Sequence, residues 1–166
     1  PLFSRPVAVD SGRVCWTVKN SIYMLDASSG EVLWADNFGA DGPLSGPALE
    51  GSSVLVALPD RVLCLDAGRG KRLWQYELPE EIGGQDRPML ALSGNKAFMV
   101  QKNYFLGARL CSLDMDSRRI DWTTSVEQPL HMLARDGTVC LRGRRIAAFD
   151  GKTGKQLWER TAQGCA

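Results

Sequence analysis

The residues of this sequence that could perform chemistry are few and widely spaced. A single histidine, His131, lies in the stretch QPLHML. A zinc centre usually combines several histidine or cysteine ligands, and a nucleophilic triad needs a histidine that a carboxylate orients. One histidine excludes a multi-histidine metal site within this chain. We expect His131 to be buried or to line a channel, and its place on an expected innermost strand makes it a candidate axial residue.

The cysteines do not form a reactive or metal-binding pattern either. There are five of them: Cys15, Cys64, Cys111, Cys140 and Cys165. No two are adjacent, none forms a CxxC pair, and an odd number excludes complete disulfide pairing. The first four lie in apolar stretches, where cysteine usually packs as a small buried hydrophobe. We therefore expect neither a metal site nor a catalytic residue among them.

Four aspartates, in contrast, recur in one fixed context. Each ends an apolar stretch and precedes a tryptophan by eight residues, and the pairs are Asp26/Trp34, Asp66/Trp74, Asp114/Trp122 and Asp150/Trp158. Such an aspartate can accept hydrogen bonds from the amides of the turn that it opens. Gly30, Gly70 and Gly154 follow their aspartates by four residues, where a tight turn often needs a positive φ. The third unit has Arg118 there, which predicts a different or strained turn.

The elements that position these residues form a repeat. Pro6, Pro47, Pro88 and Pro129 stand at intervals of 41, independently of the aspartates. Each unit divides into four short apolar stretches, which in the second unit are GPALEG, SSVLVAL, RVLCLD and KRLWQYEL. Their apolar residues alternate with a period of two, which predicts an all-β chain. Four-stranded antiparallel units of about 40 residues that stack radially form a β-propeller.

The chain is therefore predicted to hold four propeller blades within residues 1–166. We place these blades at about 3–38, 43–79, 86–126 and 127–161. The repeated tryptophan falls on the outermost strand, where its ring can cover the neighbouring blade while its indole N–H reaches a carbonyl. We expect Trp34, Trp74 and Trp158 to be largely buried. Trp16, on a second strand, is expected in a core or between blades.

The third unit is longer than the others. Pro88 to Asp114 is 26 residues, against 20, 19 and 21 in the other units, so about six residues are added around VQKNYFLGAR (100–109). Lys102, Asn103, Tyr104 and Phe105 would lengthen the hairpin between the second and third strands. Aromatic and amide residues on a loop that a rigid scaffold carries suit a recognition site. An ordinary longer hairpin with a few packed aromatic side chains is the alternative.

The segment AFDGKTGKQLW (148–158) resembles the tryptophan-docking motif of the pyrroloquinoline-quinone-type (PQQ-type) β-propellers. That motif reads alanine-x-aspartate-x-x-x-glycine-lysine-x-x-tryptophan. The match is full in the fourth unit, close in the second, where Cys64 replaces the alanine, partial in the first, and reduced to aspartate and tryptophan in the third. The resemblance covers the whole chain. It implies rings of seven or eight blades, so that four blades would be half of one.

The resemblance implies two functional alternatives. Quinoprotein dehydrogenases of this superfamily hold the quinone between a tryptophan floor and adjacent cysteines and bind Ca²⁺ beside it, and none of these residues can be placed here. We favour a non-catalytic binding or scaffold module, without a cofactor, for protein–protein interaction in the cell envelope. The alternative is a fragment of a PQQ-dependent dehydrogenase, with PQQ and calcium, whose catalytic residues lie outside this chain. A structural spacer is a third possibility.

The same resemblance suggests the partners and the compartment. We expect a protein partner, further blades of the same parent chain, or a homodimer that completes a ring, in a periplasmic or otherwise exported location. A start at Pro1 indicates a processed product or part of a longer chain. With 20 basic and 19 acidic residues among 166, the charge gives no reason to expect nucleic acid. No apolar run approaches the roughly 18 residues of a membrane span.

Overall fold

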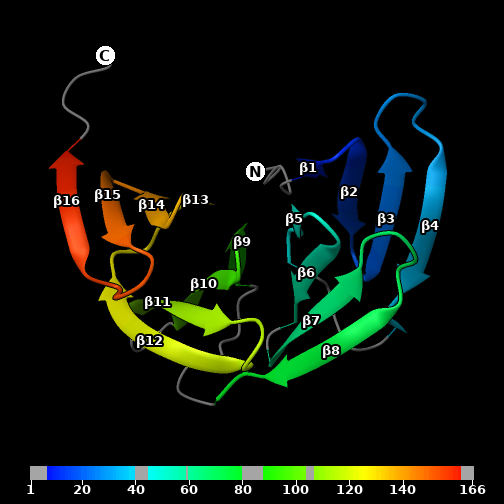
Figure 1. Cartoon of the computed structure of the whole chain (residues 1–166). Helices are drawn as coiled ribbons and strands as arrows, with labels where there is room; N and C mark the ends of the chain where they lie inside the picture. The colour runs from blue at the N-terminus through cyan, green and yellow to red at the C-terminus, as the bar shows by residue number, and fades with distance from the viewer. Residues whose placement is uncertain (1–6, 40–44, 59, 80–87, 104–106, 162–166) are drawn as a thin grey trace. The chain divides into compact units, whose positions relative to one another are not determined.

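The computed structural model describes residues 7–39, 45–58, 60–79, 88–103 and 107–161, with only the backbone at Lys102 and Asn103 (Figure 1). Within these ranges the chain forms sixteen β-strands and no helix that could span a membrane. The strands make four antiparallel four-stranded sheets, each built from consecutive strands. The predicted all-β fold of four propeller blades is confirmed. Tyr104 and Phe105 lie outside the described residues.

The chain divides into two compact units, residues 1–90 and 91–166. In the first unit, blade 1 consists of β1 (Ala8–Asp10), β2 (Arg13–Val18), β3 (Ser21–Asp26) and β4 (Val32–Asn37). Blade 2 consists of β5 (Ala48–Glu50), β6 (Ser53–Ala57), β7 (Arg61–Asp66) and β8 (Arg72–Glu77). Each blade is an antiparallel meander in which the two middle strands are the most buried, as their runs of Val, Leu, Ile and Cys require.

The remaining eight strands form blades 3 and 4. Blade 3 consists of β9 (Met89–Ser93), β10 (Lys96–Asn103), β11 (Gly107–Asp114) and β12 (Arg119–Val126). Blade 4 consists of β13 (His131–Arg135), β14 (Thr138–Arg142), β15 (Arg145–Asp150) and β16 (Gln156–Thr161). The predicted longer hairpin is present: β10 and β11 have eight residues each, and they pair as far as Asn103 opposite Gly107.

The core of the first unit lies between its two blades. Cys15 and Met24 of blade 1 pack with Val54, Val56 and Leu65 of blade 2, and all five side chains are buried. Polar contacts complete this face: the Gly51 amide donates to Asp10 Oδ2 at 2.7 Å, and Thr17 Oγ1 donates to the Ser45 carbonyl at 2.9 Å. One face of a blade is thus buried by the opposite face of the next, as a stack of repeats requires.

Each outermost strand contains a β-bulge that the sequence reading did not predict. The ladder between the third and fourth strands shifts register immediately before the repeated tryptophan, which leaves one residue unpaired. The unpaired residues are Leu33, Leu73, Asp121 and Leu157. A bulge bends the strand and redirects the neighbouring side chains. It also disrupts the exposed edge of each blade, which discourages unwanted strand pairing.

The turn that was expected to differ in blade 3 keeps the common geometry under strain. Gly30, Gly70 and Gly154 have φ of 73°, 69° and 71°, and Arg118 takes the same region with φ 57°. The Arg118 amide donates to the Asp114 carbonyl at 2.8 Å, as the Gly154 amide does to Asp150. A left-handed conformation costs a non-glycine residue about 1 kcal/mol or more.

Relieving this strain should stabilise the protein. Replacing Arg118 with Gly should raise the free energy of unfolding by about 1 kcal/mol, because glycine adopts a positive φ without a Cβ clash. Arg119→Gly, one residue on at the start of β12, is the matched control and should lower it, since glycine weakens a strand. Urea denaturation measures both changes. A loss of stability in Arg118→Gly would contradict this account of the turn.

Candidate functional site

The repeated tryptophan of blade 1 docks on the turn of blade 2. Trp34 Nε1 donates a hydrogen bond to the Ala67 carbonyl at 2.9 Å. The six-membered ring lies over Gly70, where a Cβ would be only 2.6 Å from Trp34 Cε3. Glycine is therefore needed at position 70 for two reasons, its positive φ and the close approach of the indole.

The same contact joins blades 3 and 4. Trp122 Nε1 donates to the Gly151 carbonyl at 3.1 Å, and a Cβ on Gly154 would be 2.5 Å from Trp122 Cε3. Phe98 adds a tilted ring contact with Trp122, with centroids 6.1 Å apart. The third unit, whose motif is the most reduced, therefore still docks its tryptophan. The contact depends on the glycine of the following blade rather than on that of its own.

The prediction that all the outer tryptophans are largely buried is wrong for one of them. Trp34, Trp74 and Trp122 are half-buried, whereas Trp158 is 41% exposed, because no turn among the described residues covers it. Trp16, expected in a core or between blades, is 42% exposed, and its ring centroid lies 5.7 Å from that of its cross-strand neighbour Tyr23. It lies on the face of blade 1 that blade 2 does not cover.

The repeated aspartates organise the docking turns as predicted from their position. In every blade Oδ1 accepts one or both of the amides two and three residues on, at 2.7–3.0 Å. The Ser28 hydroxyl and the Ser29 and Ser28 amides lower the pKa of Asp26 to about 2. The Thr153 hydroxyl and amide lower the pKa of Asp150 in the same way. These carboxylates are held in the charged form by their own turns.

Blade 3 supports its turn with side chains that the sequence reading missed. Lys96 Nζ donates to Asp114 Oδ2 and to Asp121 Oδ2, both at 2.7 Å, and Asn95 Nδ2 donates to Asp116 Oδ2 at 2.9 Å. The Lys96 ammonium lowers the pKa of Asp114, and the two carboxylates raise that of Lys96. A lysine at the start of β10 facing an aspartate at the bulge was the signal available in the sequence.

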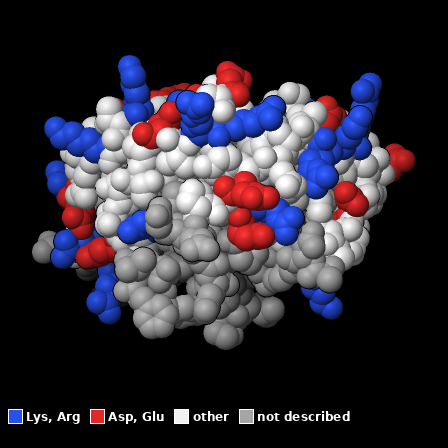
Figure 2. Space-filling view, turned by 90° about the horizontal axis from the view of Figure 1, so that it is seen from below, with Lys and Arg blue, Asp and Glu red and all other residues white. Residues whose placement is uncertain are grey.

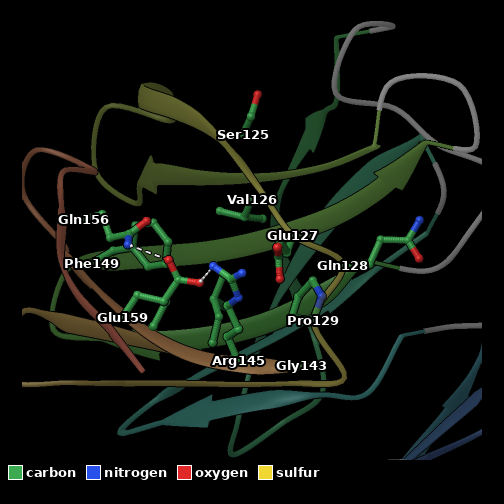
Figure 3. A pocket seen from close by; sticks show the side chains of 12 residues that line it. Ser125, Val126, Glu127, Gln128, Pro129, Gly143, Arg145, Phe149, Gln156 and Glu159 are labelled. Carbon is green, nitrogen blue, oxygen red and sulfur yellow. Dashed lines mark hydrogen bonds and ion pairs between the residues drawn. The ribbon is translucent and has the colours of Figure 1, made fainter. Parts of the chain in front are cut away.

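A pocket of about 380 Å³ lies in the second unit, between the end of β12 and the strands of blade 4 (Figure 3). Leu141, Ala147 and Phe149 give it an apolar lining, and Leu141 and Phe149 are buried. Val126, Pro129 and Gly143 also line it, and its polar lining comes from Ser125, Glu127, Gln128, Arg145, Gln156 and Glu159. An apolar lining with a few convergent polar groups is typical of a site for a ligand or a partner side chain.

An ion pair forms one wall of this pocket. Arg145 Nη1 lies 2.8 Å from Glu159 Oε1, and Gln156 Nε2 donates to Glu159 Oε2 at 3.3 Å (Figure 3). The hydrogen bond from Arg145 lowers the pKa of Glu159. Glu159, and to a smaller extent Glu127, raises the pKa of Arg145. The charges in this wall are therefore largely compensated, and Arg145 keeps further N–H donors for an incoming acceptor.

One face of the molecule shows no dominant charge among its described residues. On the face that Figure 2 presents, lysine and arginine side chains are interspersed with aspartate and glutamate. This distribution agrees with the formal net charge of +1 and gives no basic stripe for a phosphate backbone on that face.

The structure gives the histidine and the described cysteines different degrees of burial. His131 is exposed at the start of β13, so it is not buried, and its expected place along a channel stays a prediction. Cys15, Cys64 and Cys111 are buried free thiols and Cys140 is half-buried. Burial raises the pKa of Cys15 and Cys111 to about 12, which makes these thiols unreactive.

The described residues do not fit a PQQ and calcium site. Within them, no three His, Cys, Asp or Glu side chains lie close enough together to share a metal ion. The carboxylates of the repeated motif are engaged by their own turn amides, and Trp34 and Trp122 are covered by glycine turns rather than open to a planar ligand. We therefore derive no chemistry through a quinone for this part of the chain.

The docking geometry predicts unequal costs for removing the tryptophans. Trp34→Ala and Trp122→Ala should each lower the free energy of unfolding by about 2–4 kcal/mol, because each loses a ring contact and a hydrogen bond between blades. Trp158→Ala should cost less than about 1 kcal/mol, since its ring is exposed. Urea denaturation of dilute protein, followed by far-UV circular dichroism, compares the three. Equal costs would contradict the assigned contacts.

The turn carboxylates predict a loss of stability in acid. The pKa of Asp26 is about 2 in the folded protein and 3.8 ordinarily. Its stabilising contribution is therefore complete above about pH 5 and is lost as the pH falls towards 2. The melting temperature should fall over this range, and Asp26→Asn should reduce the fall, whereas Asp136→Asn on an exposed hairpin should not. An unchanged pH profile for Asp26→Asn would refute the role of this carboxylate.

Comparison with known proteins identifies the repeat. A family model described as "Outer membrane protein assembly factor BamB" matches residues 18–165. The quinoprotein alcohol dehydrogenase PedH of Pseudomonas putida is 33% identical over 161 residues, which cover 80% of this chain and 26% of that protein. The chain thus spans about a quarter of that relative's length.

Solved structures show the same fold. BamB from Moraxella catarrhalis superposes with a TM-score of 0.60 at 20% identity, over 95% of this chain and 51% of that one. The quinohemoprotein alcohol dehydrogenase from Comamonas testosteroni superposes with a TM-score of 0.69 at 16% identity, over 95% of this chain and 35% of that one. With the family match over most of the chain and the docking contacts of Trp34 and Trp122, the chain belongs to the PQQ-type β-propeller repeat family.

Proposed function

We propose that this chain is a non-catalytic binding or scaffold module for protein–protein interaction in the cell envelope, in an exported location and without a cofactor. The observation that carries the proposal is the pocket of the second unit, with Leu141 and Phe149 in its apolar lining and the Arg145–Glu159 pair in its wall. The family description, which names an outer membrane protein assembly factor, supports the compartment and the role.

The pocket suits a side chain of an extended protein segment. Ser125 and Val126, which line it, belong to β12, the outermost strand of its sheet, and this strand has a free edge within that sheet. An extended segment can add to such an edge through main-chain hydrogen bonds while an apolar side chain enters the neighbouring pocket. The N–H groups that Arg145 keeps would then donate to a carbonyl or carboxylate oxygen of the bound segment.

Two predicted features extend this proposal. Lys102 and Asn103 end the lengthened β10 strand and Tyr104 and Phe105 come next in the sequence, and we propose these four residues as a second recognition element. His131, exposed at the start of β13, is a candidate contact residue. The partner is an extended segment of another protein, further blades of the same parent chain, or a second copy of this chain.

Selection of a displayed library of short extended peptides against the whole chain tests the binding function. Peptides that occupy the pocket should lose about tenfold in affinity on Arg145→Ala, the effect of about one charge-assisted hydrogen bond. Arg135→Ala, an exposed arginine that does not line the pocket, should leave affinity unchanged. Fluorescence anisotropy measures both. A library that yields no binder, or binders indifferent to Arg145, would overturn the proposal.

A second candidate function is part of a PQQ-dependent dehydrogenase. The 33% identity to the dehydrogenase PedH favours it, with the catalytic residues outside this chain. Adding PQQ and Ca²⁺ to the purified chain separates the two functions. The scaffold proposal predicts neither quenching of tryptophan fluorescence by the quinone nor dye-linked alcohol oxidation, and saturable quinone binding would favour the dehydrogenase instead.

A further inference from the structure

Blade 1 buries one of its faces against blade 2. The corresponding face of blade 4 is not covered by any described residue of another blade. In blade 1 one cross-strand row runs Ala8, Cys15, Met24, Trp34, and blade 2 covers Cys15 and Met24 completely. The corresponding row of blade 4 runs Leu133, Cys140, Ala148, Trp158. Here Leu133 is 66% and Trp158 41% exposed, Cys140 is half-buried, and Ala148 alone of the four is fully buried.

Blade 1 leaves uncovered the opposite face. In blade 2 this face consists of two cross-strand pairs, Val54 with Leu65 and Val56 with Leu63, and blade 1 buries them to 2% exposure or less. The corresponding pairs of blade 1 are Val14 with Leu25 and Trp16 with Tyr23. Trp16 is 42% exposed and the nearby Val9 65% exposed.

No described residue packs on the Gly30 side of the docking turn of blade 1. Gly30 has a positive φ like Gly70 and Gly154, on which an indole packs. Its amide donates to the carbonyl of Asp26, the repeated aspartate of its own turn, as the amides of Gly70 and Gly154 do in their turns. A Cβ on Gly30 would meet no described atom within 4 Å, whereas on Gly70 or Gly154 it would strike an indole. Ala27 follows Asp26 as Ala67 follows Asp66, so the carbonyl that receives the indole N–H in blade 2 has its counterpart here.

We infer that blade 4 of one copy docks on blade 1 of a second copy, with Trp158 seated over the Gly30 turn and its Nε1 donating to the Ala27 carbonyl. The contact reproduces between chains the one that joins blades 1 and 2 within a chain. Within the chain, the row of blade 1 that ends in Trp34 is covered by a face of blade 2, and blade 1 has the equivalent face. Since no described residue of another blade covers that face of blade 1, a second copy of this chain offers the matching surface for the Leu133–Trp158 row. The association is head to tail, so each chain supplies one donor end and one acceptor end.

This contact specifies one of the partners in the proposed function, a second copy of the chain, and rests on that proposal. Its residues, Trp158, Gly30 and Leu133, do not line the pocket. Peptide affinity at the pocket, measured on the same variants, should not change. A wild type that binds peptides at the pocket but keeps the mass of one chain would therefore overturn only this inference. Loss of peptide binding with intact self-association would overturn only the pocket.

Sedimentation equilibrium of the whole chain over a range of concentrations tests the contact. The wild type should associate beyond the mass of one chain. Trp158→Ala and Gly30→Ala should each weaken association at least tenfold, the first by removing the indole and the second by placing a Cβ where the indole must lie. Leu133→Lys, at a 66% exposed position that folding does not require buried, should have the same effect.

Two controls match these changes. Gly12→Ala introduces a Cβ at a φ of 74° with open space around it, and Leu157→Ala removes a 52% exposed apolar side chain next to Trp158 in the sequence. Both should associate as the wild type does. A mixture of Trp158→Ala and Gly30→Ala chains should regain association, because one intact donor meets one intact acceptor. A wild type with the mass of one chain at every concentration, or a Trp158→Ala variant that associates normally, would overturn the proposal.

Discussion

The close approach of an indole ring to a glycine is the contact on which the packing of blade 1 on blade 2, and of blade 3 on blade 4, depends. A four-stranded sheet has two apolar faces and can bury neither alone, so it must be held against a second sheet at a fixed distance. Trp34 and Trp122 set this distance, because each ring rests on backbone that carries no side chain while its N–H is satisfied by a carbonyl of the same turn. The aspartate holds that turn in shape, and the bulge before the tryptophan aims the ring.

This dependence explains why the motif is divided between two blades. Trp34 packs on Gly70 of blade 2 and Trp122 on Gly154 of blade 4, so each of these rings uses the glycine of the next blade rather than a residue of its own turn. Blade 3 shows the consequence: its motif has lost the glycine, yet Trp122 docks fully because Gly154 belongs to blade 4. The turn of blade 3 keeps its shape with Arg118 under strain and with Lys96 linking Asp114 and Asp121.

The blades, their strand order and the aspartate turns could be predicted from the sequence because their signals are local. These signals are the alternation of apolar residues, a glycine four residues after the aspartate and a tryptophan eight residues after it. Neighbours in space were not predictable in the same way. The exposure of Trp158 and Trp16 depends on which faces are covered, and the pocket around Arg145 arises from residues that β12, β14, β15 and β16 bring together. The bulges were hidden because a one-residue register shift leaves the spacing between aspartate and tryptophan unchanged from unit to unit.

The division of the docking contact between successive blades also bears on how such chains change length in evolution. A segment from one tryptophan to the next carries one complete acceptor turn and one complete donor ring, as the segment between Trp34 and Trp74 does. Duplicating or deleting such a segment joins a donor to an equivalent acceptor, so the contact at the junction is regenerated without any compensating substitution. Recombination at the tryptophan codons would therefore add or remove whole repeats. A gene of this kind can change its number of blades while each intermediate protein keeps the tryptophan contacts between neighbouring blades.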